Sequence, residues 1–445
     1  MKPADGARDH PAPAPWASTG EQALFLEYYP WIIHKFTKKV GPTTTVIVAA
    51  LAPARAACVA TEDAMFSLTG LLRPFRRPTP PRSTVAHRPI VGLDIGSSAI
   101  KMAEIQRSGP RWNLLRCGLQ PLPPDAVVDG QIKQPDTVTQ AIQTLLTTHG
   151  VTTKQAAISL GGSSVITKKI QMASLTELEL EDQIALEAEE YIPFDIDEVN
   201  LDFQILGQNN DTMEILLTAC KRELIHGHTE VVRQAGLEPR VCDLDLFCLI
   251  NAYQAFIQPY AAQTTPGLAT VALVNLGATF LNIALVTHQG LPGYIRDHSL
   301  GSRQIVQEIK SRLDTTWAEA EQRLIMPEQT PQRHSEQADW HAEIITPFLE
   351  QVVQQIRQAV SFHKTGNPDQ PVTAIYLSGG AARLPQVDTL IQERMEIPVY
   401  IATPLANLTH RMGRGKQKSA TAPLIAPTDP RFLVALGLAL RGERR

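Results

Sequence analysis

A short polar turn between two apolar runs is the first part of this sequence whose residue types could do chemistry. Residues 91–105 are mostly apolar on either side of it, which predicts two β-strands joined by a turn. Gly96 allows a conformation that a Cβ would hinder, and the N–H groups of Ser97 and Ser98 can point at phosphate oxygens. Asp94 supplies a carboxylate for a hydrated Mg²⁺. The stretch predicts a hairpin that holds nucleotide phosphates, although an ordinary hairpin also fits it.

A second stretch of the same form, residues 271–286, follows roughly 180 residues later. Two apolar runs again flank a small turn, which contains Asn275, Gly277, Ala278 and Thr279. A repeat at the spacing of a domain predicts two similar halves that face one another across a cleft.

A third glycine turn ends the apolar run at 374–378. Gly379, Gly380 and Ala381 carry little or no side chain, so a nucleoside could come close to the backbone there. Three glycine turns in this order resemble the phosphate-1, phosphate-2 and adenosine motifs of the actin-like ATPase superfamily. The resemblance implies an α/β fold with two similar half-domains around a nucleotide cleft. It also implies ATP and Mg²⁺ as cofactors and further nucleotide contacts from Lys101 and Gly301.

Composition limits the class of protein. With 445 residues the chain exceeds one typical core and predicts two or more domains. A formal net charge of −4 gives no electrostatic footprint for nucleic acid. The five cysteines form no Cys-x-x-Cys pair, which favours a reducing, cytoplasmic setting. No uninterrupted apolar run approaches the roughly 20 residues that a membrane span needs.

The first 87 residues differ from the rest, because eleven of the 33 prolines fall there. We expect this segment to be disordered, or to lie upstream of the true start, for which Met65 is the natural candidate. A basic pair followed by apolar residues at 43–52 faintly resembles a signal peptide, but it begins far from the first residue.

The remaining pattern predicts alternating strands and helices. In the first half we expect a strand over 112–122, a helix over 136–146 capped by Asp136, and a strand over 156–160. A β-α-β-β-α unit follows. Its strands are expected at 165–173, 199–206 and 213–219, and its helices at 178–191 and 222–235.

Four further stretches make the resemblance narrower. They are residues 189–194, 243–247, 404–408 and 432–441. In order and spacing they resemble the PilM family of type IV pilus assembly over about residues 65–445. The extra unit is similar to the subdomain that this family shares with the cell-division protein FtsA. The implied division is an extension at 1–87, the first part of subdomain 1A at 88–162, an inserted subdomain 1C at 163–238, the connecting helix of 1A at 239–265, subdomains 2A and 2B at 266–403, and a return to 1A at 404–445.

The family resemblance implies a cytoplasmic ATP-binding scaffold that a partner holds at the inner membrane. The implied partner is PilN, whose short cytoplasmic N-terminal peptide would lie between the inserted unit and the first half. An extended peptide at a strand edge would gain main-chain hydrogen bonds. The candidate contacts are Lys168, Lys169, Tyr191, Ile192 and Phe194, although the last three also fit an ordinary core role.

The chain departs from the superfamily at two places. Asn275 stands where the phosphate-2 motif normally carries an Asp that helps to hold the Mg²⁺ shell, so metal binding should depend more on Asp94 and ATP turnover should be slow. The nucleoside-contacting helix of the family carries Glu-x-x-Lys. An ungapped alignment places Glu319 at the Glu but Gln322 at the Lys, with Arg323 beside it.

Candidate catalytic residues are few. Asp245 stands where relatives place a residue that orients the attacking water, and helix capping by Asp243 or Asp245 is the alternative. His226 and His228 are the nearest approach to a metal pair and are expected at the surface.

Two other functions stay open. A phosphotransferase of the sugar-kinase type would need an acceptor pocket with a dedicated base, and the sequence points to none. An FtsA-like division protein is disfavoured, because the sequence ends after its last apolar helix without an amphipathic membrane tail.

Overall fold

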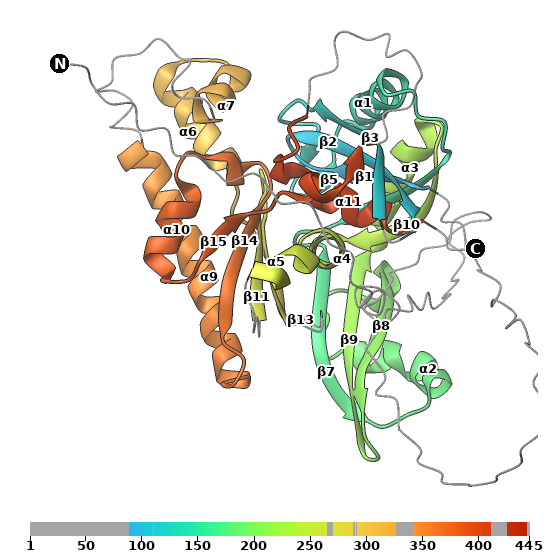
Figure 1. Cartoon of the computed structure of the whole chain (residues 1–445). Helices are drawn as coiled ribbons and strands as arrows, with labels where there is room; N and C mark the ends of the chain where they lie inside the picture. Colours follow the sequence, from blue (N-terminus) through green and yellow to red (C-terminus); the bar gives the residue numbers. More distant parts are fainter. Residues whose placement is uncertain are drawn as a thin grey trace, which may run out of the picture.

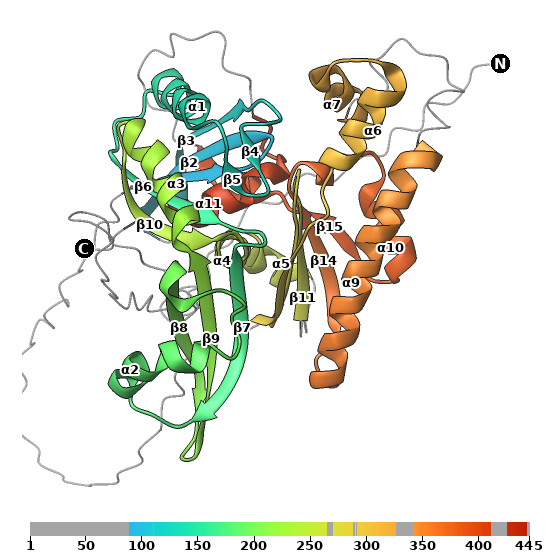
Figure 2. The ribbon, with the colours of Figure 1, turned by 180° about the vertical axis from the view of Figure 1, so that it is seen from behind.

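Two β-sheets, one from each half of the chain, lie side by side with helices between and outside them (Figures 1 and 2). The computed structural model describes residues 89–109, 111–264, 270–287, 290, 292–325, 341–410 and 425–442. The extension expected at 1–87 lies outside the described residues, so that prediction stays untested.

The first sheet has the strand order β10-β6-β1-β2-β3-β16. β1, β2 and β3 form an antiparallel meander, and β6 and β10 continue the sheet in parallel. Helices α1 and α3 cover one face and α4 and α11 the other, so the central strands are apolar on both faces. The bounds are β1 Val91–Ile95, β2 Ala99–Ser108, β3 Arg111–Pro121, the small hairpin β4 Val127–Val128 and β5 Gln131–Ile132, α1 Pro135–Thr148, β6 Gln155–Leu160, α3 Arg222–Gln234, β10 Glu238–Leu244, α4 Asp245–Phe256, β16 Thr409–His410 and α11 Leu433–Ala439.

The second sheet repeats this plan in the order β13-β12-β11-β14-β15. β11 and β12 form the antiparallel hairpin, and β14 and β15 add in parallel. α9 and α10 cover its outer face (Figure 1). The bounds are β11 Thr270–Leu276, β12 Leu281–Thr287, β13 Pro292–His298, α6 Arg303–Leu313, α7 Trp317–Ile325, α9 Thr346–Gly366, β14 Val372–Ser378, α10 Val387–Met395 and β15 Val399–Ile401. The repeated hairpin and crossover confirm the two similar halves expected from the sequence.

Two apolar helices, α4 and α11, cross at the centre of the molecule. Their packing needs glycine at the crossing, because a Cβ on Gly437 would collide with the backbone of Cys248. Gly92 plays the same part in β1, where a Cβ would strike the backbone of α11. The short helix α5, Gln258–Thr264, continues from α4 toward the second sheet (Figure 1).

A three-stranded sheet in the order β7-β9-β8 extends from the first half, away from α1 (Figures 1 and 2). Helix α2 packs on one face of this sheet through Leu180, Ile184 and Ala188. The chain enters and leaves the unit at one point, where the N–H of Lys221 donates to the carbonyl of Ser164 at 3.2 Å. The bounds are β7 Val165–Ala173, α2 Glu177–Ala188, β8 Val199–Gln208 and β9 Thr212–Lys221.

Four expectations about elements need correction. Helix α3 packs on the first sheet beside α1, not in the inserted unit, so the unit ends near Lys221. β10 and β13 were not predicted. Asp136 lies in the first turn of α1, and Gln134 is the N-cap residue. Asp243 lies in β10 rather than in a helix, where its buried carboxylate pairs with Arg441, Nη2 to Oδ2 at 2.6 Å.

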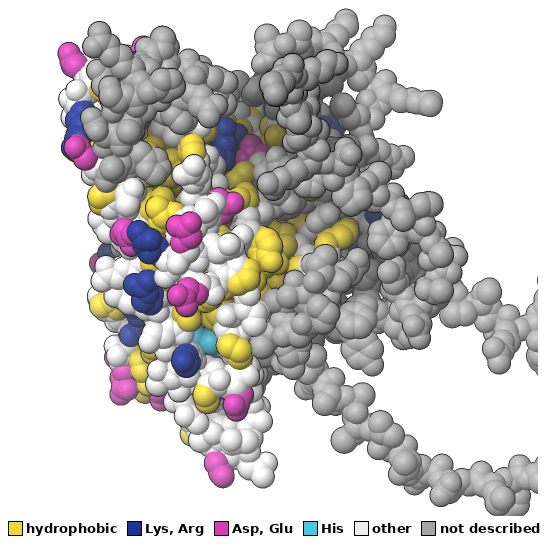
Figure 3. All heavy atoms as spheres, turned by 60° about the vertical axis from the view of Figure 1, so that its left-hand side comes forward, with side chains coloured by type: hydrophobic (Ala, Val, Ile, Leu, Met, Phe, Trp, Pro, Cys, Tyr) yellow, Lys and Arg dark blue, Asp and Glu magenta, His cyan; other side chains and the backbone are white. Residues whose placement is uncertain are grey.

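The described surface carries mixed charge. On the face in Figure 3, acidic and basic side chains are interspersed with apolar ones. Within the described ranges, no helix is both long enough and apolar enough to cross a bilayer.

Candidate functional site

The phosphate-1 turn lies between β1 and β2. Lys101 folds back over it, since a Cβ on Gly96 would lie 2.7 Å from the lysine Nζ. The same Nζ forms an ion pair with Asp94, 3.0 Å from Oδ2. Ser97 and Ser98 complete the turn and are half-buried. The turn therefore presents a cation, a carboxylate and two small hydroxyl residues to the cleft.

The phosphate-2 turn between β11 and β12 faces the first turn directly. Thr279 donates its hydroxyl to the Oγ of Ser97 at 2.8 Å, so the two turns touch across the cleft. The carbonyls of Gly277 and Ala278 accept backbone N–H groups from the start of α6, and Arg303 donates to Ala278 at 2.9 Å. The structure thus brings two sequence-predicted turns, 182 residues apart at these side chains, into contact.

A line of hydrogen bonds crosses the second sheet beside this turn. The Oγ of Ser378 donates to the Oδ1 of Asn275 at 3.3 Å, and the Nδ2 of Asn275 donates to the Oδ1 of Asn282 at 2.7 Å. The Nδ2 of Asn282 then donates to the Oδ1 of Asp297 at 2.7 Å. The other oxygen of Asp297 accepts the N–H of Gly162, from the first half, at 2.8 Å. Asp297 was not a sequence candidate, because β13 was not predicted.

Asp245 lies at the junction of β10 and α4, between the two halves. It does not cap the helix, since Leu244 is the N-cap residue and no side chain caps that end. Burial, followed by the charge of Asp94, raises the pKa of Asp245 to about 7. Asp297 adds to the rise and Lys101 opposes it. Carboxylates from β1, α4 and β13 therefore meet at the cleft beside one lysine.

The adenosine turn follows β14. Gly379 has a φ of 89°, and a Cβ there would meet the Leu276 carbonyl and the Oδ1 of Asn275. Only glycine suits this junction of β11 and β14. A Cβ on Gly380 would have no heavy atom within 4 Å, so this residue faces open space. Ala381 is buried at the start of the short helix η4, Ala381–Arg383.

A charged cluster next to the adenosine turn was not predicted from the sequence. Glu321 on α7 is half-buried, and burial raises its pKa while the charges of Arg431 and Arg383 oppose the rise. Arg431 also donates two hydrogen bonds to Asp429, from Nε to Oδ1 at 3.0 Å and from Nη2 to Oδ2 at 2.6 Å. A cavity of about 610 Å³ opens beside Arg383, Asp429 and Arg431. A carboxylate held here can accept hydrogen bonds from the hydroxyl groups of a ribose.

Glu319, the residue chosen from the sequence, points away from this cluster. It is exposed, and its Oε2 accepts from the N–H of Thr316 at 3.1 Å and from the hydroxyl of Thr315, so it caps its own helix. The charge of Arg323 lies near Glu319 rather than near Glu321. Glu319 therefore lies outside this cluster, although the ungapped alignment places it at the Glu of the nucleoside-contacting helix. The apolar spacing of Trp317, Ala320 and Leu324 could have shown that Glu321 shares the inward face.

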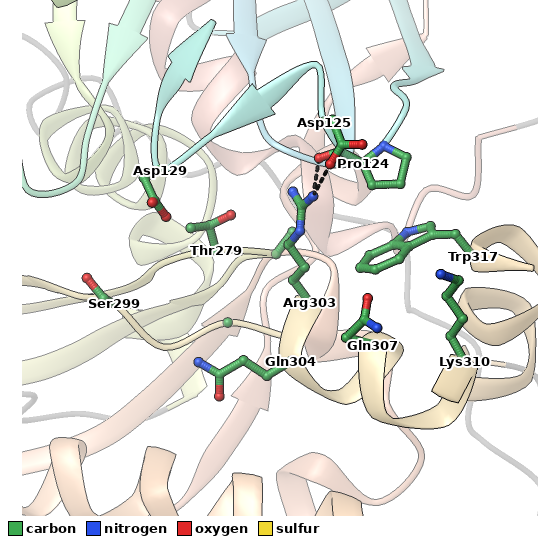
Figure 4. A pocket seen from close by; sticks show the side chains of 12 residues that line it. Pro124, Asp125, Asp129, Thr279, Ser299, Arg303, Gln304, Gln307, Lys310 and Trp317 are labelled. Carbon is green, nitrogen blue, oxygen red and sulfur yellow. Dashed lines mark hydrogen bonds and ion pairs between the residues drawn. The ribbon is translucent and has the colours of Figure 1, made fainter. Parts of the chain in front are cut away.

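A cavity of about 460 Å³ extends from the phosphate-2 turn between the two halves (Figure 4). Gly301 lines it at the entrance to α6. Arg303 reaches across it to the carbonyl of Pro124 and to Asp125, with Nη2 3.5 Å from Oδ1. The guanidinium also lies 5.3 Å from the ring centre of Trp317. This arginine joins α6 to the loop before β4.

The candidate partner residues gather at one end of the inserted unit. Ile192 is a core residue, 6% exposed, while Tyr191 and Phe194 pack against that core and stay half-buried. The Nζ of Lys168 lies 5.9 Å from the ring centre of Tyr191. Lys169 pairs instead with Glu214 on β9, at 2.7 Å on the other face of the sheet. The structure brings four of the five together and leaves Lys169 apart.

Direct coordination of a metal by the protein is not indicated. Among the described residues, no group of three or more His, Cys, Asp or Glu side chains is arranged to hold an ion. The donor set at the cleft, carboxylates that pair with Lys101 and with amides, fits a hydrated Mg²⁺ held through water better than a dedicated metal cage.

Comparison with known proteins agrees with this architecture. A solved PilM-PilN type IV pilus biogenesis complex matches with a TM-score of 0.65 and 24% identity, over 79% of this chain and 98% of that one. The ethanolamine utilization protein EutJ from Carboxydothermus hydrogenoformans matches with a TM-score of 0.46 and 17% identity, over 82% of this chain and 92% of that one. The α/β architecture is the actin-like ATPase fold expected from the three glycine turns. The family described as Type IV pilus assembly protein PilM matches residues 92–443, and the chain belongs to that family.

Proposed function

We propose that this protein is a cytoplasmic ATP-binding scaffold of the inner-membrane platform that assembles type IV pili, and that it binds the N-terminal peptide of PilN. The observation that carries the nucleotide part is the convergence of the predicted turns, in which Thr279 contacts Ser97 across the cleft. Membership of the PilM family, and the likeness to a PilM-PilN complex, support the partner.

The cleft residues divide into two ends. Ser97, Ser98 and Lys101 would hold the phosphates from the first half, and Thr279 from the second. Bound Mg²⁺ would neutralise phosphate charge through its water shell, facing Asp94. Glu321 would accept the ribose hydroxyl groups near Gly380. Because Asn275 leaves the phosphate-2 turn itself without a carboxylate, we expect turnover of ATP to be slow or absent.

Asp245 is the residue that we propose to orient an attacking water in any turnover. Its position at the start of α4 places it between Asp94 and Asp297 rather than in solvent. The sequence points to no acceptor pocket with a dedicated base beside it. This favours a nucleotide-controlled scaffold over a phosphotransferase, which would need an acceptor pocket with its own base.

The peptide site that we propose lies on the inserted unit. β7 has a neighbouring strand, β9, on one side only within the described residues, so its other edge can add a strand. The rings of Tyr191 and Phe194 lie at the end of the inserted unit where the candidate partner residues gather. The Nζ of Lys168 lies 5.9 Å from the ring centre of Tyr191, and the Nζ of Lys221 lies 4.4 Å from that of Phe194. These features suit an extended peptide that carries acidic or apolar side chains.

The nucleotide proposal is tested by titrating a fluorescent ATP analogue, with MgCl₂, into the purified protein. Gly380→Val should abolish binding and leave the melting temperature unchanged, because the new side chain enters open space. Gly366→Val is the matched control, since it also meets open space but lies at the end of α9. Wild-type affinity in Gly380→Val would place the nucleoside elsewhere.

The partner proposal is tested with a synthetic peptide of the PilN N-terminus. Lys168→Glu should weaken binding, while Lys364→Glu at the far end of α9 should not. A second variant joins Ser164 to Lys221 through two glycines and removes the inserted unit, because these residues already share a backbone hydrogen bond. If that variant stays folded, binds ATP and still binds the peptide with full affinity, the inserted unit is not the receptor.

A further inference from the structure

In the superfamily pattern, the second half carries a carboxylate at the phosphate-2 turn. In this chain a carboxylate, that of Asp297, lies two strands away from that place. Asn275 occupies that place on β11, and Asp297 occupies the same level on β13. The register pairs Asn275 with Asn282 and Asn282 with Asp297, so the three side chains form one row across the sheet. The row ends at the cleft, where Asp297 meets Gly162 of the first half.

The direction of the hydrogen bonds in this row is fixed. The carboxylate of Asp297 can only accept, whereas the hydroxyl of Ser378 at the other end can donate or accept, so Asp297 sets the direction. In this direction the Nδ2 of Asn275 donates to Asn282 and its Oδ1 accepts from Ser378. Asn282 therefore accepts on its oxygen and donates from its nitrogen to Asp297. An Asp at position 275 would need a donor from Asn282, which would then turn its oxygen toward Asp297. Two carboxylates in the row are incompatible, whereas one carboxylate at either end is fully satisfied.

The carboxylate of Asp297 keeps capacity for a further partner. Its two oxygens offer about four lone-pair sites, and two protein N–H groups use two of them. It also faces the other acids of the cleft. The Oδ2 of Asp297 lies 3.5 Å from the position that a Cβ on Gly161 would take, and Asp245 lies against the same position.

We propose that Asp297 supplies the negative charge of the second half to the hydrated Mg²⁺ of bound ATP, in place of Asn275. The inference rests on the proposed nucleotide site and assigns a residue within it. Asp94 serves from the first half and Asp297 from the second, so the cation shell is held from both sides although the phosphate-2 turn is neutral. Asn282 is the positioning residue that orients Asp297.

The test compares the affinity of a fluorescent ATP analogue in MgCl₂ and in EDTA. Loss of a carboxylate that orders a metal shell typically costs about 10- to 100-fold in metal affinity. In Asp297→Asn we therefore expect binding in MgCl₂ to weaken about tenfold, with binding in EDTA unchanged. Asp314→Asn is the matched control, because Asp314 is an exposed acid at the end of α6 in a left-handed conformation that Asn also adopts.

The double variant N275D/D297N exchanges the carboxylate and the amide between the two ends of the row. It should restore the Mg²⁺ effect, because it reverses the row without leaving a group unpaired. It also serves if Asp297→Asn alone does not fold. Equal losses in MgCl₂ and EDTA would show that Asp297 only ties the two halves together, and would overturn the inference. A wild-type protein that bound no nucleotide would contradict the proposed function itself.

Discussion

At the scale of single residues, the prediction made for one histidine was wrong. His228 was expected at the surface, but it is 3% exposed inside α3, and its Nδ1 lies 3.0 Å from the carbonyl of Leu224. Burial lowers the pKa of His228 to about 4, while the bond to the carbonyl acts in the opposite direction. The nearby His226 is exposed, so the pair does not form a metal site.

This burial predicts an acid sensitivity of the fold. The unfolded chain takes up a proton on His228 near its ordinary pKa of 6.5, and the folded chain only near 4. Between these values the unfolded state holds more protons, so the free energy of unfolding falls as the pH falls. The loss attributable to His228 should reach about 2 kcal/mol at pH 5. Urea unfolding of wild type and His228→Leu between pH 7.5 and 5 measures the difference.

The matched control for this experiment is His226→Leu, two residues earlier on the same helix. It should follow the wild-type dependence on pH, because its side chain stays in water. Parallel stability curves for wild type and His228→Leu would contradict the account.

The sequence predicted most of the residues in the two phosphate turns, because glycine and small polar residues between apolar runs mark a turn wherever it folds. It did not point to Glu321 or Asp297, which we propose as nucleotide-site residues, for different physical reasons. Glu321 lies on the inward face of α7, and the alignment by motif ignored that face. Asp297 is placed at the cleft by the row across β11, β12 and β13, which exists only once the strands pair.

At the scale of helices and strands, the main feature is the crossing of α4 and α11. The α11 sequence is apolar all round because every residue of the helix is buried. At the crossing, a Cβ on Gly437 would overlap the backbone of Cys248, which cannot move aside as a flexible side chain can. Gly437→Ala should therefore destabilise the fold by about 1–3 kcal/mol, measured by urea unfolding.

Gly227 inside α3 provides the matched control for that substitution. A Cβ there meets no heavy atom within 4 Å, so Gly227→Ala should stabilise the protein by about 1 kcal/mol. Opposite signs for the same chemical change would separate packing at the crossing from helix propensity. A neutral Gly437→Ala would mean that the two helices do not cross as closely as described.

Two of the strands that the sequence did not predict, β10 and β13, have a mixed composition. β10 contains Pro239 and the charged residues Glu238, Arg240 and Asp243, and β13 begins with Pro292 and ends in charged residues, so neither is a continuous apolar run. Helix α3 was predicted, but the sequence of a helix does not say which sheet it packs on. That choice depends on α1 and β6, which are distant in sequence.

At the scale of the whole molecule, the question is how the two halves are held together. Among the described residues, the contacts that join the two halves include Thr279 to Ser97, Gly162 to Asp297, and Arg303 to the loop at Pro124 and Asp125. Phosphates bound between the turns would compete for the first contact. The contact through Arg303 lies near the surface, since the side chain of its partner Asp125 is 82% exposed.

We expect Arg303 to influence how readily the cleft opens. Its guanidinium reaches from α6 to the loop at Pro124 on the opposite half, and Trp317 packs against it (Figure 4). We expect Arg303→Ala to raise both the association and the dissociation rate constants of a fluorescent ATP analogue, with a smaller change in affinity, because closure slows entry and exit alike. Stopped-flow mixing measures both rates, and small-angle scattering should show a larger radius of gyration. Arg312→Ala, on the same helix but paired with Glu308 and Glu343 of its own half, is the control and should change neither rate. Unchanged rates in Arg303→Ala would show that this contact does not limit the opening of the cleft, and that others, such as Thr279 to Ser97 and Gly162 to Asp297, hold the halves together.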